Sequence, residues 1–253
     1  MKMNLIILLA FFCMASCGSD NTTSSNPQDE DTVASDELNL PCIDDEAAII
    51  LPSNLENQES ASQFEAALLV WSAVHLSNSF RESLSQVLLP PDDAVSLTVD
   101  NITINTGDKG FEWLVGDEKY VYVYREFGYQ IYYYNQGDLA GEELIYVDQN
   151  EDCSSFEYIQ YAIEAEGQKE EGDVEFLFNY QKAGTAKIVS FGTDIYDAQN
   201  EEYRLRSFED LSGDLTIKNG GKVTQKISWN TDGSGQYQVL ENGIIIEEGT
   251  WSF

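Results

Sequence analysis

The chain lacks most of the side-chain sets that common enzymes use. It contains one histidine, His75, so a zinc-protease helix with two histidines is excluded, and a Ser-His-Asp triad would have to use this residue. The sequence has no Gly-x-Ser-x-Gly motif, no Walker loop and no Gly-rich dinucleotide fingerprint. We therefore predict no catalytic residue and no cofactor. A carboxylate-based glycoside hydrolase stays an alternative, because acidic residues are too abundant for any one pair to stand out.

Basic residues are also scarce. The chain has 13 Lys and Arg against 45 Asp and Glu, a formal net charge of −32 at pH 7. A field of this sign repels nucleic acids and anionic membranes, so nucleic-acid binding is excluded, and it favours cations and basic partners. The alternative interpretation is that the acidic side chains form a solvated coat that keeps the protein soluble.

The N-terminal apolar run, Leu5 to Met14, is too short for a transmembrane helix. It has about ten residues, whereas a membrane-spanning helix needs about 20. Lys2 precedes it, and the small residues Ala15 and Ser16 follow it, which completes the three parts of a signal peptide. We therefore expect residues 1–16 to be removed on export, which leaves a formal net charge of −33 because only Lys2 is lost among the charged side chains.

Met14-Ala15-Ser16-Cys17 resembles the lipobox of bacterial lipoproteins, with methionine where leucine is usual. The resemblance covers only the first seventeen residues. It implies cleavage before Cys17 and acylation of that cysteine, for example by palmitate, and more than one acyl chain gives stable attachment to a membrane. Gly18 instead of Asp after the cysteine favours the outer membrane, with the protein facing the periplasm or the cell surface. The alternatives are an ordinary secretory signal and a short N-terminal helix of a cytosolic protein.

Four cysteines limit the disulfide and metal chemistry. Cys13 leaves with the signal peptide and Cys17 carries lipid, so Cys42 and Cys153 remain. In an oxidising compartment we expect a disulfide between them, with two free thiols as the alternative. On the chain-entropy model this bond stabilises the fold by roughly 4 kcal/mol. Two cysteines and one histidine supply too few soft ligands for zinc, and we predict no metal site.

Two regions follow the signal peptide. Residues 17–45 are rich in Ser, Thr, Asn, Asp and Glu, which cannot offset the entropy of ordering, so we expect a lipidated and disordered acidic tether. Residues 46–253 are expected to form a single β-rich domain.

One helix is predicted at about residues 60–88. Ser60 and Gln63 fit a capping box, and Pro90-Pro91 must end the helix. Its apolar stripe is predicted to contain Phe64, Leu68, Trp71 and His75, widened by Ala67, Val74 and Leu76. His75 is expected to be a core or rim histidine.

From Val95 onward the hydrophobic pattern has the period of β-strands. Strands are predicted at residues 95–104, 111–115, 119–126, 129–134, 143–147, 156–165, 174–180, 186–191, 214–218, 222–229, 235–240 and 244–251. The last four are joined by Asn219-Gly220-Gly221, Asn230-Thr-Asp-Gly233 and Glu241-Asn-Gly243, residues that supply the positive φ of tight hairpin turns. No internal repeat of solenoid or propeller period is visible.

The predicted fold class is mainly β. We expect an antiparallel meander that forms a curled sheet or a barrel, with the N-terminal helix packed on it. In element order it is similar to lipocalin-like domains and to the half-barrel of the bacterial lipoprotein-carrier family.

Two segments are candidate binding sites. Asp148-Gln-Asn150-Glu-Asp152 starts like an EF-hand calcium loop, but Cys153 replaces the required Gly and Ile159 the bidentate Glu, so a polar hairpin loop is the alternative to a looser calcium site. Half of the 14 tyrosines lie between residues 120 and 134. We predict that a tyrosine-lined surface contacts the ligand, with cross-strand packing as the alternative; the predicted ligand-binding residues are Tyr120, Tyr122, Tyr124, Tyr129 and Tyr133.

These observations predict a membrane-anchored lipoprotein that acts as a non-enzymatic binding module. The ligand would be a glycan, a lipid, a small apolar molecule or a protein partner. A structural or assembly role in the cell envelope is the alternative function.

Overall fold

A computed structural model describes residues 47–87, 95–96, 109–115, 118–125, 128–134, 142–161, 174–193 and 200–253, all within one compact unit, Thr32–Phe253. The helices are α1 (Ser53–Glu56), α2 (Gln58–Ala61) and α3 (Glu65–Val87). The strands are β1 (Val95–Ser96), β2 (Lys109–Val115), β3 (Glu118–Arg125), β4 (Gly128–Tyr134), β5 (Glu142–Gln149), β6 (Ser155–Tyr161), β7 (Val174–Ala183), β8 (Ala186–Thr193), β9 (Glu201–Phe208), β10 (Gly213–Asn219), β11 (Lys222–Trp229), β12 (Gly235–Glu241) and β13 (Ile244–Trp251).

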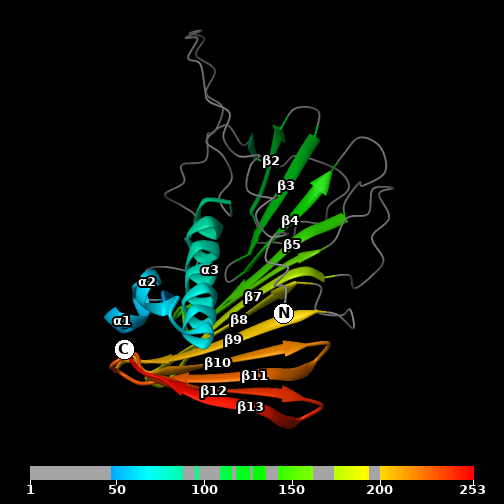
Figure 1. Cartoon of the computed structure of the whole chain (residues 1–253). Coiled ribbons are helices and arrows are strands. Elements are labelled where there is room, and N and C mark those ends of the chain that lie inside the picture. Colours follow the sequence, from blue (N-terminus) through cyan, green and yellow to red (C-terminus); the bar gives the residue numbers. More distant parts are fainter. Residues whose placement is uncertain are drawn as a thin grey trace. The chain divides into compact units, whose positions relative to one another are not determined.

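The strands form one antiparallel meander, as predicted. Each strand pairs with its neighbours in the chain, in the order β1 to β13 (Figure 1). Among the described residues no pairing joins β13 back to β1. The barrel alternative is therefore wrong for this part of the chain, where the sheet stays open.

The hairpin turns predicted near the C-terminus are confirmed. Gly220 and Gly221 have φ of 56° and 72°, and Asn242 and Gly243 have φ of 50° and 80°. Two consecutive residues with positive φ give the backbone twist that matches two antiparallel strands. The local sequence thus fixes the β10–β11 and β12–β13 connections.

Sequence analysis missed one strand, β9. Its core-facing residues include Leu205 and Ser207, both buried, but Glu202, Arg204 and Arg206 alternate with them. These charged residues hide the apolar period, although alternation itself is intact. The predicted strand at residues 95–104 is described only at Val95–Ser96, and the rest of it lies outside the described residues.

The long helix begins later than predicted. Ser60 lies in α2, where the Asn57 side chain caps the helix by accepting a hydrogen bond from the Ser60 backbone N–H at 3.0 Å. A new helix, α3, then begins at Glu65. The predicted capping box of Ser60 and Gln63 is wrong, because an Asn three residues earlier supplies the cap.

The predicted apolar face of α3 is confirmed in part, because Phe64, Trp71 and Leu76 pack against the core. Ala67, Val70 and Val74 are completely buried, whereas Leu68, Trp71 and His75 are only partly buried. Small residues let the helix approach the sheet closely, so the larger side chains lie at the edges of the contact. His75 is thus a rim histidine.

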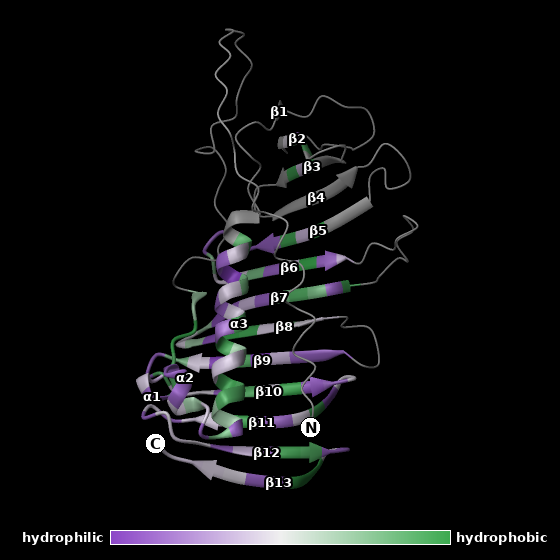
Figure 2. Ribbon diagram, turned by 45° about the horizontal axis from the view of Figure 1, so that its top comes forward, coloured by the Kyte–Doolittle hydropathy of each residue, from purple (hydrophilic) through white to green (hydrophobic). Residues whose placement is uncertain are grey.

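α3 crosses the strands of the sheet rather than following them (Figure 2). Near its C-terminal end, the Phe80 ring lies 4.2 Å from the ring of Phe176 and 5.3 Å from that of Phe178. α3 also contacts β9 and β12. Helix and sheet residues form one hydrophobic core, which also contains Leu205, Leu215, Ile227 and Trp229.

The last strands repeat one arrangement at a spacing of 22 residues, which the sequence analysis did not detect. Trp229 and Trp251 each lie across a glycine of the neighbouring strand, Gly213 and Gly235 respectively. The Trp229 indole N–H donates to the Leu211 carbonyl at 2.9 Å, and that of Trp251 to the Gly233 carbonyl at 2.8 Å. The Trp229 indole thus closes the β9–β10 turn and the Trp251 indole the β11–β12 turn.

The same turns share an aspartate and a serine. Asp210 accepts a hydrogen bond from the Ser212 backbone N–H at 3.0 Å, and Asp232 accepts one from the Ser234 backbone N–H at 3.0 Å. Hydrogen bonds from the serine hydroxyl and backbone lower the pKa of both carboxyls below their ordinary value of 3.8. The Asp, Ser, Gly and Trp residues of the two copies all lie 22 positions apart, but few other residues of the copies are identical. The repeat is therefore hard to detect from the sequence.

Within the described part of the chain, none of the helices combines the length and the apolarity that a membrane crossing needs.

Candidate functional site

The most distinctive surface lies on the face of the sheet opposite α3. Side chains alternate between the two faces of a strand, so the residues between the core positions Leu205, Leu215 and Ile227 point the other way. In β9 to β12 these alternate residues are polar. We call this surface the polar face; it consists of Arg204, Arg206, Asp214, Thr216, Lys226, Ser228, Gln236 and Gln238.

The strand register arranges the polar face in two rows. In the first row, Arg206 lies opposite Asp214, which in turn lies opposite Ser228 and then Gln236. In the second row, Arg204 lies opposite Thr216, followed by Lys226 and Gln238. Four consecutive strands therefore contribute one side chain to each row.

An ion pair occupies one end of the first row. The Arg206 Nε lies 2.6 Å from the Asp214 Oδ2, and the Arg206 guanidinium lies 5.3 Å from the centre of the Phe208 ring. Both partners are partly exposed, with 49% and 31% of their side-chain surfaces accessible. Such a pair adds at most about 1 kcal/mol to stability, but it fixes the direction of a charged side chain.

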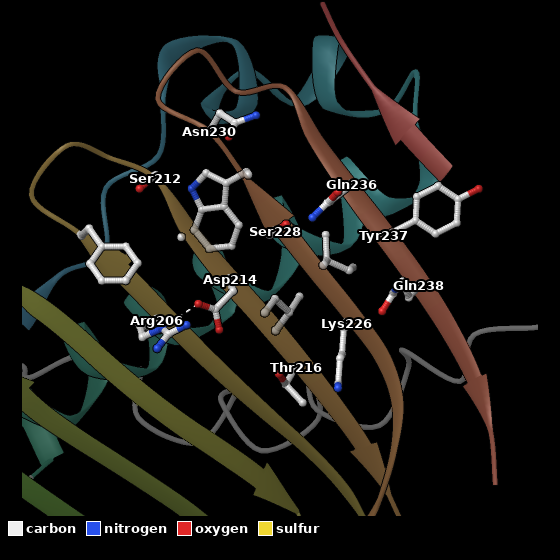
Figure 3. Close-up of a pocket in the computed structure, with 15 residues that line it drawn as sticks. Arg206, Ser212, Asp214, Thr216, Lys226, Ser228, Asn230, Gln236, Tyr237 and Gln238 are labelled. Carbon is white, nitrogen blue, oxygen red and sulfur yellow. Dashed lines mark hydrogen bonds and ion pairs between the residues drawn. The ribbon is translucent and has the colours of Figure 1, made fainter. Parts of the chain in front are cut away.

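Apart from Arg204, which lies beside it, the residues of these rows line a shallow, open groove of about 510 Å³, which lies within the range of roughly 300–1,000 Å³ for small-ligand sites. Figure 3 shows Arg206, Asp214, Thr216 and Lys226 along its floor, with Ser228 and Gln236 further along. The Tyr237 side chain points away from them, and its hydroxyl donates to Glu247 at 3.0 Å. The groove therefore offers amides, hydroxyls and charges to a ligand.

The described residues on the opposite face of these strands pack against α3. There Trp229, Trp251 and Ile227 pack into the core together with α3 residues, and all three are at most 4% exposed. Two grooves of the described residues lie on β9 to β12 and beside the β12–β13 turn. A lipid or small apolar ligand thus finds no apolar groove at the polar face.

The groove contains one carboxylate, Asp214, among its lining residues. A glycoside hydrolase needs two, about 5–9.5 Å apart. The described residues also include no group of three or more His, Cys, Asp and Glu side chains arranged to hold a metal ion. The described lining residues of the groove offer hydrogen bonds and charge to a ligand.

The predicted tyrosines lie on the neighbouring strands β3 and β4. The register pairs Tyr120 with Tyr133 and Tyr124 with Tyr129, but these four side chains lie outside the described part of the structure. Tyr122 is 1% exposed, and its ring lies 6.1 Å from that of Phe111 within the core. Burial of Tyr122 favours the packing alternative for this residue, and ligand contact by the other four stays a prediction.

The segment that resembles the start of a calcium loop is a hairpin turn between β5 and β6. Asp152 accepts a hydrogen bond from the Ser154 backbone N–H at 3.0 Å, and Cys153 has a φ of 55°. Cys153 is exposed in this turn. Cys42 lies outside the described residues, so the disulfide stays a prediction.

His75 belongs to a small cluster at the edge of α3. Its ring lies 4.3 Å from that of Trp71, and its Nε2 lies 3.3 Å from the Glu56 Oε1. The Trp71 indole N–H donates to the Glu56 carbonyl at 3.0 Å. This cluster attaches α1 to α3, and no serine–histidine hydrogen bond is present in it.

Sequence analysis missed the polar face because it missed β9. One signal was available: 5 of the 13 basic residues fall between positions 204 and 226, a strong local concentration in so acidic a chain. Alternation of Arg204, Leu205 and Arg206 would have indicated a strand with two cations on one face.

No protein-family model matches this chain, and a comparison with curated proteins finds no match. The functional interpretation therefore depends on the residues themselves.

Proposed function

We propose that the protein is a lipid-anchored lipoprotein of the bacterial cell envelope that binds an extended glycan on its polar face without chemically changing it. The observation that carries this proposal is the continuous set of polar side chains across β9 to β12 along one groove. A polysaccharide chain presents many hydroxyl groups, which both donate and accept hydrogen bonds. The groove matches them with groups of the same versatility: the amides of Gln236 and Gln238 and the hydroxyls of Thr216 and Ser228.

The composition of the groove favours a glycan over a protein partner. The centres of protein interfaces are enriched in aromatic residues and Met, and depleted in Lys and Ser. Here Lys226 and Ser228 lie on an inner strand of the rows and the two glutamines on β12, while Phe208, Trp229 and Tyr237 are the aromatic lining residues. An open groove also accepts a chain longer than itself, whereas an enclosed cavity holds a single small molecule.

An open sheet is compatible with a binding site on its exposed face. An open sheet with a helix on one face is closer in element order to the half-barrel of lipoprotein carriers than to a closed lipocalin barrel. This similarity does not imply a lipid ligand, because α3 and the core residues fill the inner face of the sheet.

A glycan array tests the binding proposal. Fluorescently labelled protein should bind a subset of neutral or acidic glycans, and a Gln236→Ala, Gln238→Ala double variant should bind the same glycans more weakly. The matched control is Gln58→Ala in α2, which removes an exposed amide away from the groove. Absence of binding to every glycan, or equal binding by the double variant, would refute the proposal.

The anchor has an independent test. Cells grown with an alkynyl fatty acid should label the wild-type protein at Cys17, and the Cys17→Ser variant should stay unlabelled. Fractionation of the same cells should place the wild type in the outer membrane. Equal labelling of both proteins would contradict lipidation without affecting the glycan-binding proposal.

A further inference from the structure

The polar face carries an excess of positive charge in a chain of strongly negative net charge. On the outward positions of β9, β10 and β11 lie four basic residues, Arg204, Arg206, Lys218 and Lys226, and two acidic residues, Glu202 and Asp214. Asp214 pairs with Arg206 at 2.6 Å and Glu202 with Lys218 at 2.9 Å. Within the described residues, no carboxylate forms an ion pair with Arg204 or Lys226.

These two cations flank one residue. Thr216 lies opposite Arg204 on one side and opposite Lys226 on the other. Neighbouring strands are about 4.8 Å apart, so the two backbones are separated by about 10 Å. Arg and Lys side chains are long enough to reach a group placed above the central strand. The Thr216 hydroxyl adds a third donor beneath that position.

The net charge of the chain does not cancel this local excess. At physiological ionic strength the Debye length is about 8 Å, so exposed acidic residues farther away are largely screened. The two carboxylates on these outward positions, Glu202 and Asp214, are paired with Lys218 and Arg206. A negatively charged group above Thr216 therefore meets Lys226 in the groove and Arg204 beside it.

We infer that the glycan bound at the polar face is acidic, and that Arg204 and Lys226 together hold one of its sugar carboxylates above Thr216. The guanidinium binds a carboxylate through two parallel N–H donors and the ammonium through a single one. Ser228 and Gln238 then contact the hydroxyls of the adjoining sugar rings. This inference rests on the proposed glycan-binding function and specifies its ligand class.

The test compares three probes by isothermal titration calorimetry with the full-length protein. Polygalacturonate oligomers carry a carboxylate on each sugar, their carboxyl-reduced form has the same rings without charge, and polyglutamate carries carboxylates without sugars. We expect binding of polygalacturonate only, and weaker binding as the salt concentration rises. Equal binding of the carboxyl-reduced form would overturn the inference and leave glycan binding intact. Equal binding of polyglutamate would overturn the proposed function itself.

Variants locate the site. Arg204→Gln and Lys226→Gln should each weaken polygalacturonate binding about tenfold, as expected for loss of one charge-assisted hydrogen bond. Both residues are exposed, so circular dichroism should show unchanged folding. Lys182→Gln is the matched control, because it makes the same change of charge at an exposed position outside the groove. Unchanged affinity in both groove variants would overturn the inference.

Discussion

Replacing Gly235 by alanine probes the packing that builds the β11–β13 part of the sheet. A Cβ atom at this position would lie closer than 3.0 Å to the Trp251 ring and to the Ser228 backbone carbonyl. Real Cβ atoms essentially never approach other atoms so closely. Trp251 is only 4% exposed, and its indole N–H is held by the Gly233 carbonyl at 2.8 Å. The ring therefore cannot move aside without losing that hydrogen bond.

The expected loss of stability combines three contributions. Overpacking a well-packed site costs about 1–3 kcal/mol, and loss of the indole hydrogen bond adds about 1 kcal/mol. Replacing glycine in a strand returns roughly 0.5–1 kcal/mol by reducing the entropy of the unfolded chain. We expect the free energy of unfolding to fall by about 1–3.5 kcal/mol, which lowers Tm by roughly 2–14 °C for a domain of this size.

Urea unfolding followed by tryptophan fluorescence measures this change. Gly213→Ala should cost a similar amount, because Trp229 and the Arg206 carbonyl surround it in the same way. Gly249→Ala is the control: the three atoms nearest its Cβ would be outer atoms of the Tyr237 side chain. This side chain is partly exposed and can turn away, so we expect a loss below about 1 kcal/mol. If Gly235→Ala unfolded at the wild-type urea concentration, Trp251 would not pack across that glycine.

Three further predictions concern the packing of α3, the titration of Asp232 and the predicted disulfide. Phe80→Ala should lower the free energy of unfolding by about 2–4 kcal/mol, because the ring is partly buried against Phe176 and Phe178. The control Leu114→Ala, at an exposed position, should change urea unfolding little. Equal effects of the two variants would contradict the packing of α3 on the sheet. Because the pKa of Asp232 is lowered, its contribution to stability is present above pH 4 and is lost as the pH falls further. The urea midpoint of Asp232→Asn should therefore fall less between pH 5 and pH 2 than that of the wild type. An identical pH dependence of the two proteins would refute this prediction. If Cys42 and Cys153 form a disulfide, alkylation of the denatured protein should add mass only after reduction, and labelling without reductant would exclude the bond.

Local sequence was sufficient to predict much of the sheet. Asn-Gly and Gly-Gly pairs identify hairpin turns because few other residues adopt consecutive positive φ angles, and the strands beside them alternate clearly. β9 was missed because Glu202, Arg204 and Arg206 supply charge where an apolar residue would have strengthened the pattern. Charged residues on the solvent face are compatible with a strand, so alternation was the better criterion there.

Longer-range features could not be predicted in the same way. Whether a meander closes depends on the accumulated twist and curvature of all its strands, which no single segment encodes. The buried face of α3 was predicted only in part: Ala67 and Val74 belonged to the predicted face, but the completely buried Val70 did not. The larger Leu68 and Trp71 are only partly buried. The polar face joins side chains of four strands, and it exists only once their register is fixed.

Blocking the groove tests the central claim most directly. Ser228→Trp places a large ring in the middle of the polar face, whereas Thr250→Trp places the same ring in the same cross-strand row on β13, outside the groove. Binding of the best array glycan should be lost in the first variant and kept in the second, with both folded by circular dichroism. Retention of wild-type affinity in Ser228→Trp would show that the ligand binds elsewhere.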